Sequence, residues 1–148
     1  MALDQASLAL LQGMAARGGK PMNESTPVEV RANSAGTIAL IGPGPEMVSA
    51  REYDLTAEDG GASSVRVLVP SDAPRGVLVY YHGGGWVIGS VDGYDTLGRQ
   101  LAEATNMIVA LVEYRLAPEH KYPASNHDAW AALRWVEAHA DELGVAGL

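Results

Sequence analysis

Three consecutive glycines follow a histidine near the middle of the chain, in the stretch His82-Gly83-Gly84-Gly85-Trp86. Glycine loses more chain entropy on folding than other residues and contributes no side-chain packing. A run of glycines is therefore useful where the backbone must come close to another group with its N–H donors uncovered. The preceding run, Val77 to Tyr81, is uncharged and rich in β-branched and aromatic residues. It predicts a strand buried on both faces, as in a parallel sheet, with a backbone-donor site at its end.

A second polar stretch follows the apolar run from Met107 to Val112, which predicts another fully buried strand. This loop contains two prolines and several changes of charge, in the order Glu113-Tyr114-Arg115-Leu116-Ala117-Pro118-Glu119-His120-Lys121-Tyr122-Pro123. Pro123 or Ala124 is expected to open a last helix, with Trp130 packed in or at the edge of the core. Gly144 suits the residue just beyond the end of that helix.

The composition excludes several kinds of site. The chain has no cysteine, which excludes disulfides, thiolate catalysis and cysteine-bound zinc. None of its four histidines lies in the His-Glu-x-x-His spacing of zinc enzymes, so no metal site is expected. The formal net charge of -8 gives no electrostatic footprint for nucleic acid or for an anionic membrane surface.

The first residues lack the basic region of a signal peptide. No apolar run reaches the length of a membrane span. We therefore expect a cytoplasmic protein without a membrane span.

Two helices are predicted before the first strand. Leu3 to Met14 predicts an amphipathic helix that ends near Gly18 and Gly19. Thr26 as N-cap, Pro27 at the first helical position and Glu29 as the partner in a capping box predict a second helix that ends near Ala35. A Gly-Pro-Gly-Pro linker at 42–45 then separates this helical part from the rest.

Four strands are predicted after the linker. The first two flank a turn at 57–62 and predict a hairpin. The last two are separated by a helix at 94–105, which predicts that they are parallel. The predicted strands are 48–55, 64–70, 76–82 and 107–112. The fold class that follows is α/β.

Taken in order, the motifs at 82–86 and 114–124, followed by a helix with Asp128 and Trp130, resemble the hormone-sensitive-lipase-like esterases. These are the bacterial family IV lipolytic enzymes of the α/β-hydrolase fold. The resemblance extends from about Asp4 to Leu148, with one departure, since Glu113 stands where these enzymes usually have Asp. It implies a partial α/β-hydrolase sheet of the first four strands. Residues 1–45 would be a helical lid or cap segment, and residues 46–148 would be the N-terminal half of the core, without the nucleophile-elbow half.

The resemblance also implies roles for individual residues. Gly83, Gly84 and Gly85 would form the oxyanion hole, with the N–H groups of Gly84 and Gly85 as donors and Gly83 shaping the turn. Trp86 would lie beside the substrate pocket. The residues implied to brace the loops are His82, Tyr114, Arg115 and Glu119. The resemblance implies no metal and no organic cofactor.

The serine nucleophile of such enzymes lies on a Gly-Asp-Ser-Ala-Gly elbow after a fifth strand, which is expected past Leu148. Ser34, in Ala-Asn-Ser-Ala-Gly, matches a relaxed form of the elbow. An elbow requires a strand before it and a helix after it, whereas Ser34 follows a predicted helix and precedes a linker. Ser90 is expected to be a turn or helix-cap residue. None of the catalytic triad is therefore expected in the chain, and negligible esterase activity is expected from it alone.

Two functions are compatible with these residues. The first is a carboxylic ester hydrolase acting on small esters, to which this chain supplies the oxyanion hole and part of the lid. The alternative is a catalytically inactive, truncated fragment that acts as a complementing or binding module. In the family, the strand at 77–81 pairs with the strand at 107–112 and with the fifth strand. An exposed sheet edge is therefore expected here, together with either a second chain that carries the C-terminal half or self-association.

Overall fold

The computed structural model describes residues 3–16, 18 and 20–145. Its elements, in order, are α1 (Gln5–Ala16), a 3-10 turn (Met22–Glu24), α2 (Pro27–Ile41), β1 (Ser49–Thr56), β2 (Ala62–Val69), β3 (Val77–Tyr81), α3 (Val91–Thr105), β4 (Ile108–Glu113) and α4 (Ala124–Ala138).

The four strands form one mixed sheet in the order β1-β2-β4-β3. The predicted hairpin is confirmed, because β1 and β2 pair antiparallel with Ser49 opposite Val69. The predicted parallel pair is also confirmed, with Val77 of β3 opposite Ile108 of β4. β2 joins the two pairs by running antiparallel to β4. The fold class is therefore α/β, and β3 lies at one edge of the sheet.

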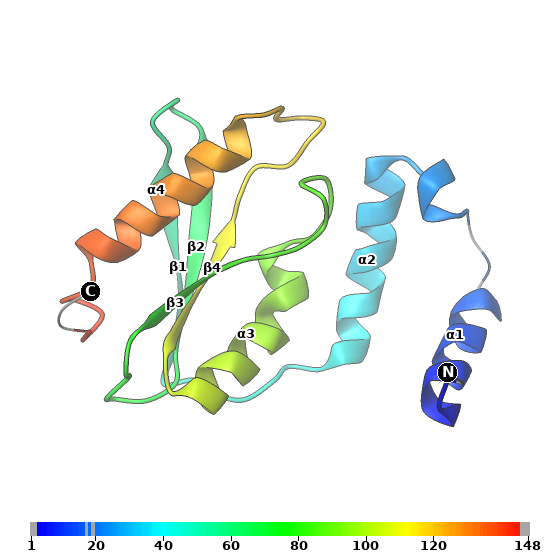
Figure 1. Ribbon diagram of the computed structural model, residues 1–148, viewed down its shortest axis with the longest axis horizontal. Helices are drawn as coiled ribbons and strands as arrows, with labels where there is room; N and C mark the ends of the chain where they lie inside the picture. Colours follow the sequence, from blue (N-terminus) through cyan, green and yellow to red (C-terminus); the bar gives the residue numbers. More distant parts are fainter. Residues whose placement is uncertain (1–2, 17, 19, 146–148) are drawn as a thin grey trace.

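Helices cover both faces of the sheet, with α4 on one side and α3 on the other (Figure 1). Alternate residues of β4 face these two layers: Val112 belongs to the cluster that contains Ala132 of α4, and Leu111 to the cluster that contains Ala102 of α3. This explains why β4 is buried on both faces, as predicted. The same prediction for β3 is wrong, because its residues are half-buried and Tyr81 is exposed. A strand at the edge of a sheet lacks a neighbour on one side.

α3 lies very close to the sheet at Gly98. A Cβ added there would lie 2.9 Å from Cδ1 of Leu111 and 3.0 Å from Cδ1 of Leu68. Glycine inside a helix is destabilising relative to alanine, so its presence here is explained by this close approach of the helix to β2 and β4.

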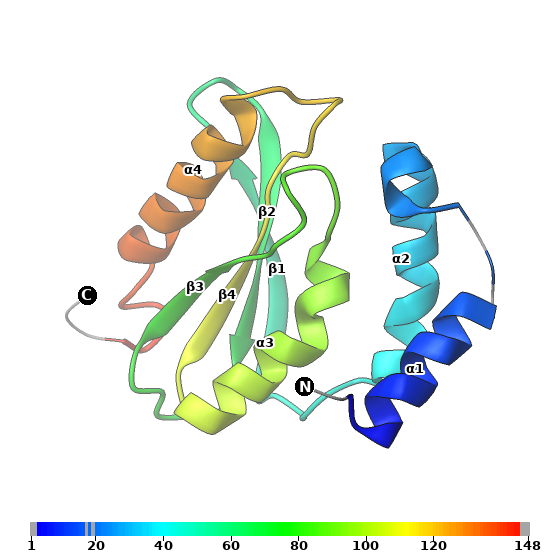
Figure 2. The same ribbon diagram turned by 45° about the vertical axis from the view of Figure 1, so that its right-hand side comes forward.

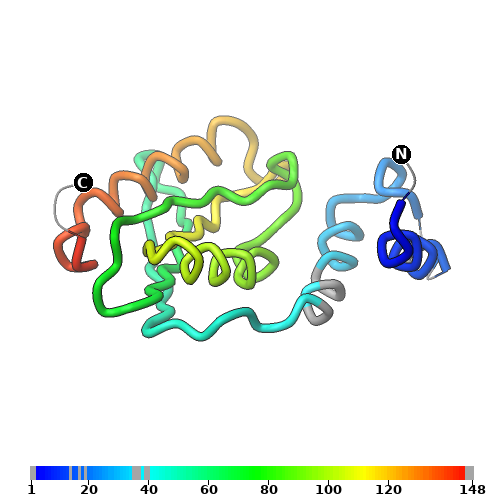
Figure 3. The backbone as a smooth tube through the Cα atoms, turned by 60° about the horizontal axis from the view of Figure 1, so that its bottom comes forward, coloured from blue at the N-terminus to red at the C-terminus, as the bar shows by residue number. Residues whose placement is uncertain are grey.

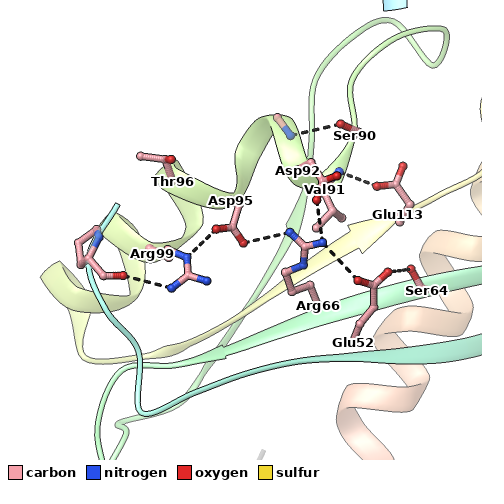
Figure 4. A network of polar contacts seen from close by, with 12 residues as sticks. Glu52, Ser64, Arg66, Ser90, Val91, Asp92, Asp95, Thr96, Arg99 and Glu113 are labelled. Atoms are coloured by element: carbon pink, nitrogen blue, oxygen red, sulfur yellow. Dashed lines mark hydrogen bonds and ion pairs between the residues drawn. The ribbon is translucent and has the colours of Figure 1, made fainter. Parts of the chain in front are cut away.

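A polar network also fastens α3 to the sheet (Figure 4). Arg66 of β2 donates to Asp92 and Asp95 of α3. At the start of the helix, Glu113 accepts from the Val91 N–H at 2.6 Å, and Ser90 accepts from the Gly93 N–H. Ser90 is therefore the N-cap of α3, which is one of the two roles predicted for it. The helix starts at Val91 rather than at the predicted Tyr94.

α2 begins as predicted, since Thr26 and Glu29 form a capping box. It continues to Ile41, beyond the predicted end at Ala35. Ser34 therefore lies inside the helix, where its hydroxyl donates to the Val30 carbonyl at 2.9 Å. A serine in the middle of a helix is not on a nucleophile elbow.

α1 and α2 lie beyond α3, away from the sheet (Figure 2). They occupy the end of the molecule opposite the C-terminal end of α4 (Figure 3). α1 forms as predicted and ends at Ala16; Gly19 lies outside the described residues. Its expected apolar face is not buried, because Leu8, Leu10 and Leu11 are all exposed.

α4 begins at Ala124, as predicted, but it ends at Ala138 and not near Gly144. Among the helices that the structure describes, none is both long and apolar enough to cross a membrane.

Candidate functional site

The loop from β3 to α3 turns sharply at its glycines. Gly84 has a φ of +132°, and a Cβ there would lie 2.0 Å from the carbonyl oxygen of Ile88. No other residue fits this position without a shift of the backbone. The Gly84 carbonyl accepts from the N–H groups of Val87 and Ile88, at 3.2 and 3.0 Å. The next two residues, Gly85 and Trp86, also hold positive φ angles of 61° and 59°.

This turn leaves backbone donors unused. Within the part of the chain that the structure describes, the N–H groups of Gly84 and Gly85 donate to no acceptor. Adjacent free N–H groups in such a turn can bind an anion or an oxygen that acquires negative charge during a reaction.

A cavity of about 590 Å³ opens at these glycines. It is lined by Tyr81, His82, Gly83, Gly84, Gly85, Trp86, Tyr114, Ser125, Asn126, Ala129, Trp130 and Leu133. Aromatic and aliphatic groups dominate, and no Asp, Glu, Lys or Arg appears among these lining residues. A site of this kind suits an uncharged, mainly apolar ligand with one polar group directed at the free amides.

His82 and Tyr114 contact each other at the start of the glycine loop. His82 is buried, and its Nδ1 lies 3.0 Å from the Gly83 carbonyl oxygen. The Tyr114 hydroxyl donates to the His82 carbonyl at 2.6 Å, and the two rings are stacked with centroids 4.3 Å apart. Burial raises the pKa of Tyr114, which keeps its hydroxyl a donor. These contacts join the end of β3 to the end of β4, where loop bracing was predicted.

Arg115 follows β4 in the chain and is not among the residues that line this cavity. Its guanidinium donates to Asp128, which is fully buried in α4, and to Asp59 in the turn between β1 and β2. The hydrogen bonds to Asp128, opposed by burial and reinforced by Asp59, raise the pKa of Arg115. Arg115 thereby ties the loop after β4 to a helix and to the hairpin.

Glu119 makes a bidentate pair with Arg31 of α2, with both N–O distances at 2.9 Å. This hydrogen bonding lowers the pKa of Glu119 below its ordinary value. Arg31 also donates to the carbonyls of Val87 and Ala117, each at 2.7 Å. The Ala117 N–H in turn donates to the Trp86 carbonyl at 2.8 Å. The two loops and α2 therefore meet at one junction.

The sequence prediction missed several residues of the site. Arg31 was not singled out, because its partner Glu119 lies 88 residues away. Trp130 was predicted to pack in or at the edge of the core, and this is wrong: 56% of its surface is exposed, and it lines the cavity with Leu133. The helical spacing marks both residues as apolar, but it does not tell a core from a cavity wall.

A second cavity, of about 520 Å³, lies on the α2 side of the glycine loop. It is lined by Arg31, Ser34, Ile38, Ile41, Gly83, Gly84, Ile88, Gly89, Ser90, Gly93 and Tyr94. The described residues contain no group of three or more His, Cys, Asp or Glu side chains placed to hold a metal ion.

Comparison with known proteins identifies the fold. A family model described as an alpha/beta hydrolase fold matches residues 78–147. The chain superposes on a hyperthermophilic esterase from the archaeon Pyrobaculum calidifontis with a TM-score of 0.87 and 34% identity, over 98% of this chain and 47% of that one. The chain has the α/β-hydrolase fold. The predicted resemblance to the hormone-sensitive-lipase-like esterases is thereby confirmed.

Two curated relatives are named as ester hydrolases. The carboxylesterase NlhH of Mycobacterium tuberculosis is 57% identical over 68 residues, which are 46% of this α/β-hydrolase chain and 21% of the relative. The ethyl acetate hydrolase of Pseudomonas putida is 38% identical over 130 residues, or 84% of this chain and 41% of the relative. The chain therefore spans less than half the length of the relatives it matches.

Proposed function

We propose that this chain supplies the oxyanion hole and part of the lid of a serine-type carboxylic ester hydrolase, and that it does not supply the Ser-Asp-His triad. The observation that carries the proposal is the pair of free N–H groups at Gly84 and Gly85, which lie at the wall of an uncharged, largely apolar cavity. Attack of a nucleophile on an ester carbonyl places negative charge on its oxygen. A backbone donor held ready for that oxygen lowers the barrier by about 3 kcal/mol.

The other residues of the site have supporting roles in this proposal. Gly83 shapes the turn, and Trp86, whose side chain is 65% exposed, forms part of the substrate pocket. His82 and Tyr114 hold the glycine loop through their mutual contacts. Arg115 and Glu119 hold the loop after β4 through Asp128 and Arg31.

The same proposal divides the chain into a lid segment, residues 1–45, and the N-terminal half of a hydrolase core, residues 46–148. Its support is the position of α1 and α2 away from the sheet (Figure 2), together with the contribution of α2 to the second cavity at the glycine loop. The substrates proposed are small, uncharged esters, because the first cavity has no charged lining residue. A cytoplasmic location stays a prediction, which cell fractionation would check.

The test is hydrolysis of a chromogenic short-chain ester by the chain alone, and by the chain mixed with a C-terminal fragment of a carboxylesterase relative that carries the serine elbow, Asp and His. We expect activity only in the mixture. Gly84→Ala should lower the rate of the mixture by roughly 10²- to 10³-fold, whereas Gly13→Ala in α1 should leave it unchanged. Activity of the chain alone would refute the claim that it lacks a nucleophile.

A second candidate, a binding module without catalysis, is favoured by one observation: the cavity is formed although no described serine lies on a strand-to-helix elbow. Titration of the chain with an aryl ketone, shaped like a short ester but not hydrolysable, would measure such binding. Saturable binding, combined with a mixed complex that forms but does not hydrolyse esters, would favour this candidate over the first.

A further inference from the structure

We propose that Arg31 is a positioning residue that holds the glycine loop to α2 and so fixes the orientation of the Gly84 and Gly85 amides. Its meaning for catalysis rests on the proposed function, but its structural part does not. Arg31 lies in the second turn of α2, and its side chain is 29% exposed.

The guanidinium of Arg31 joins three segments. Its Nε donates to the Val87 carbonyl in the glycine loop, and its Nη2 donates to the Ala117 carbonyl in the loop after β4, both at 2.7 Å. Nη1 and Nη2 also hold the two oxygens of Glu119 at 2.9 Å. This use of several N–H groups in a fixed planar fork is a property of arginine that the single ammonium of lysine does not reproduce.

Only a few hydrogen bonds separate Arg31 from the glycines of the candidate site. Val87, whose carbonyl Arg31 binds, donates its own N–H to the Gly84 carbonyl. Trp86, the neighbouring residue, accepts from the Ala117 N–H, and the Ala117 carbonyl binds Arg31. The result is a closed circuit of hydrogen bonds around the end of the glycine turn. A shift of Arg31 therefore moves the peptide units that orient Gly84 and Gly85.

α2 has little other burial with which to hold this position. Among its residues whose burial the structure describes, Val30 alone is buried, while Val28 and Ile41 are exposed. The anchoring of α2 near the loop therefore depends strongly on Arg31. If the N-terminal segment moves as a lid, Arg31 is the point at which that movement reaches the amides.

Residue-resolved amide hydrogen exchange of the full 148-residue chain tests the proposal without any substrate. In Arg31→Met, the amides of Val87, Ile88 and Ala117 should exchange at least about tenfold faster than in the parent chain, because their local opening becomes easier. The amides of Val109 and Leu111 in β4 should keep their rates. The matched control is Arg134→Met in α4, which removes an exposed pair with Glu137 and should change none of these amides.

Arg31→Lys is the second variant, in case Arg31→Met folds poorly. Lysine keeps the charge opposite Glu119 but not the fork, so the three loop amides should exchange at rates between those of the parent chain and Arg31→Met. Unchanged loop amides in Arg31→Lys and Arg31→Met, or an equal acceleration in β4, would overturn the proposal.

In the mixed complex described above, Arg31→Met should lower kcat more than it raises KM, because the donors act on the transition state. A rise in KM alone would overturn the catalytic part of the proposal. Accelerated loop exchange in a chain whose mixtures never hydrolyse esters would leave the positioning role standing and count against the proposed function. The two proposals are therefore distinguishable.

Discussion

Gly84 and Trp86 both hold positive φ angles, +132° and 59°, two residues apart in the same loop. For a residue with a side chain, the left-handed backbone conformation costs roughly 1–2 kcal/mol of conformational free energy. Glycine occupies the position where a Cβ would meet the Ile88 carbonyl, and Trp86 occupies one where Ala117 holds its carbonyl in place. The loop thus has no room for a side chain at Gly84, and a hydrogen bond holds the backbone carbonyl in place at Trp86.

Gly84→Ala should lower the free energy of unfolding of the chain by about 3 kcal/mol, because the added Cβ must displace the Ile88 backbone at a strained φ. Urea unfolding followed by circular dichroism measures this change. Gly13→Ala is the matched control, since a Cβ at this exposed helical position meets nothing within 4 Å. It should stabilise the chain slightly, by at most about 1 kcal/mol. Equal midpoints for Gly84→Ala and the parent chain would show that the loop has another conformation of similar energy.

Tyr114→Phe should cost about 1–2 kcal/mol of stability, because it leaves the buried His82 carbonyl without the hydroxyl that donates to it at 2.6 Å. Tyr122→Phe is the control, because the Tyr122 side chain is 82% exposed. Thermal unfolding of both variants provides the comparison. If the two variants have the same midpoint, the Tyr114 hydroxyl does not brace the loop.

At the scale of single residues, the sequence-based predictions were correct for features that depend on residues close together in the chain. Thr26 and Glu29 are three residues apart, and their capping box was predicted correctly. The glycine run at the end of β3 was likewise placed correctly. The pairing of Arg31 with Glu119 depends on the packing of α2 against two loops, and no local pattern encodes it.

At the scale of elements, the helix ends were the least predictable features. α2 passes through Gly36 and ends only at Ile41, before Gly42, whereas the prediction stopped it near Ala35. α3 starts at Val91 because Ser90 and Glu113 bind its first amides, although Gly93 suggests a turn. At the start of α3, these contacts from outside the helix outweigh the local propensity of a glycine.

The attachment of α2 to the loop after β4 should depend on pH through Glu119. Its pKa lies below the ordinary value of 4.5 in the folded chain, so the ionised form stabilises the fold. This contribution is fully present above pH 4.5 and is lost as the pH falls through the lowered pKa. Urea midpoints measured from pH 7 to pH 3 should therefore differ most between the parent chain and Glu119→Gln at neutral pH, and the difference should shrink in acid.

Glu137→Gln is the control for this pH series. Glu137 pairs with Arg134, and both side chains are largely exposed, so the substitution should change the midpoint little at any pH. A constant difference between Glu119→Gln and the parent chain down to pH 3 would contradict the role of the Arg31 pair.

At the scale of the whole molecule, β3 forms an edge of the sheet: it pairs with β4 on one side, and within the described part of the chain no strand pairs with its other side. Tyr81 at the end of this strand is exposed, and Trp130 and Leu133 of α4 are exposed nearby around the same cavity. Unpaired strand edges beside apolar surface favour association with another chain. The resemblance to the esterases was sufficient to predict this edge, because the sheet order follows from the family.

The chain should therefore self-associate as its concentration rises, which size-exclusion chromatography with light scattering measures. Tyr81→Lys places a charge at the edge and should shift the chain toward monomer. Tyr122→Lys is the control, because it adds the same charge at a highly exposed position in the loop before α4. A parent chain that stays monomeric over the whole concentration range would remove the case for self-association.

The close approach of α3 to the sheet at Gly98 has a consequence for the distant glycine loop. α3 begins where this loop ends, so the depth at which the helix lies determines the gap that residues 82–90 must bridge. A bulkier residue at 98 would push against Leu111 and Leu68 and lift the helix from the sheet. The loop would then be stretched, although every residue in it was unchanged. The absence of a side chain at Gly98 thus allows the helix to lie close to the sheet, and this closeness determines the distance that the loop must span.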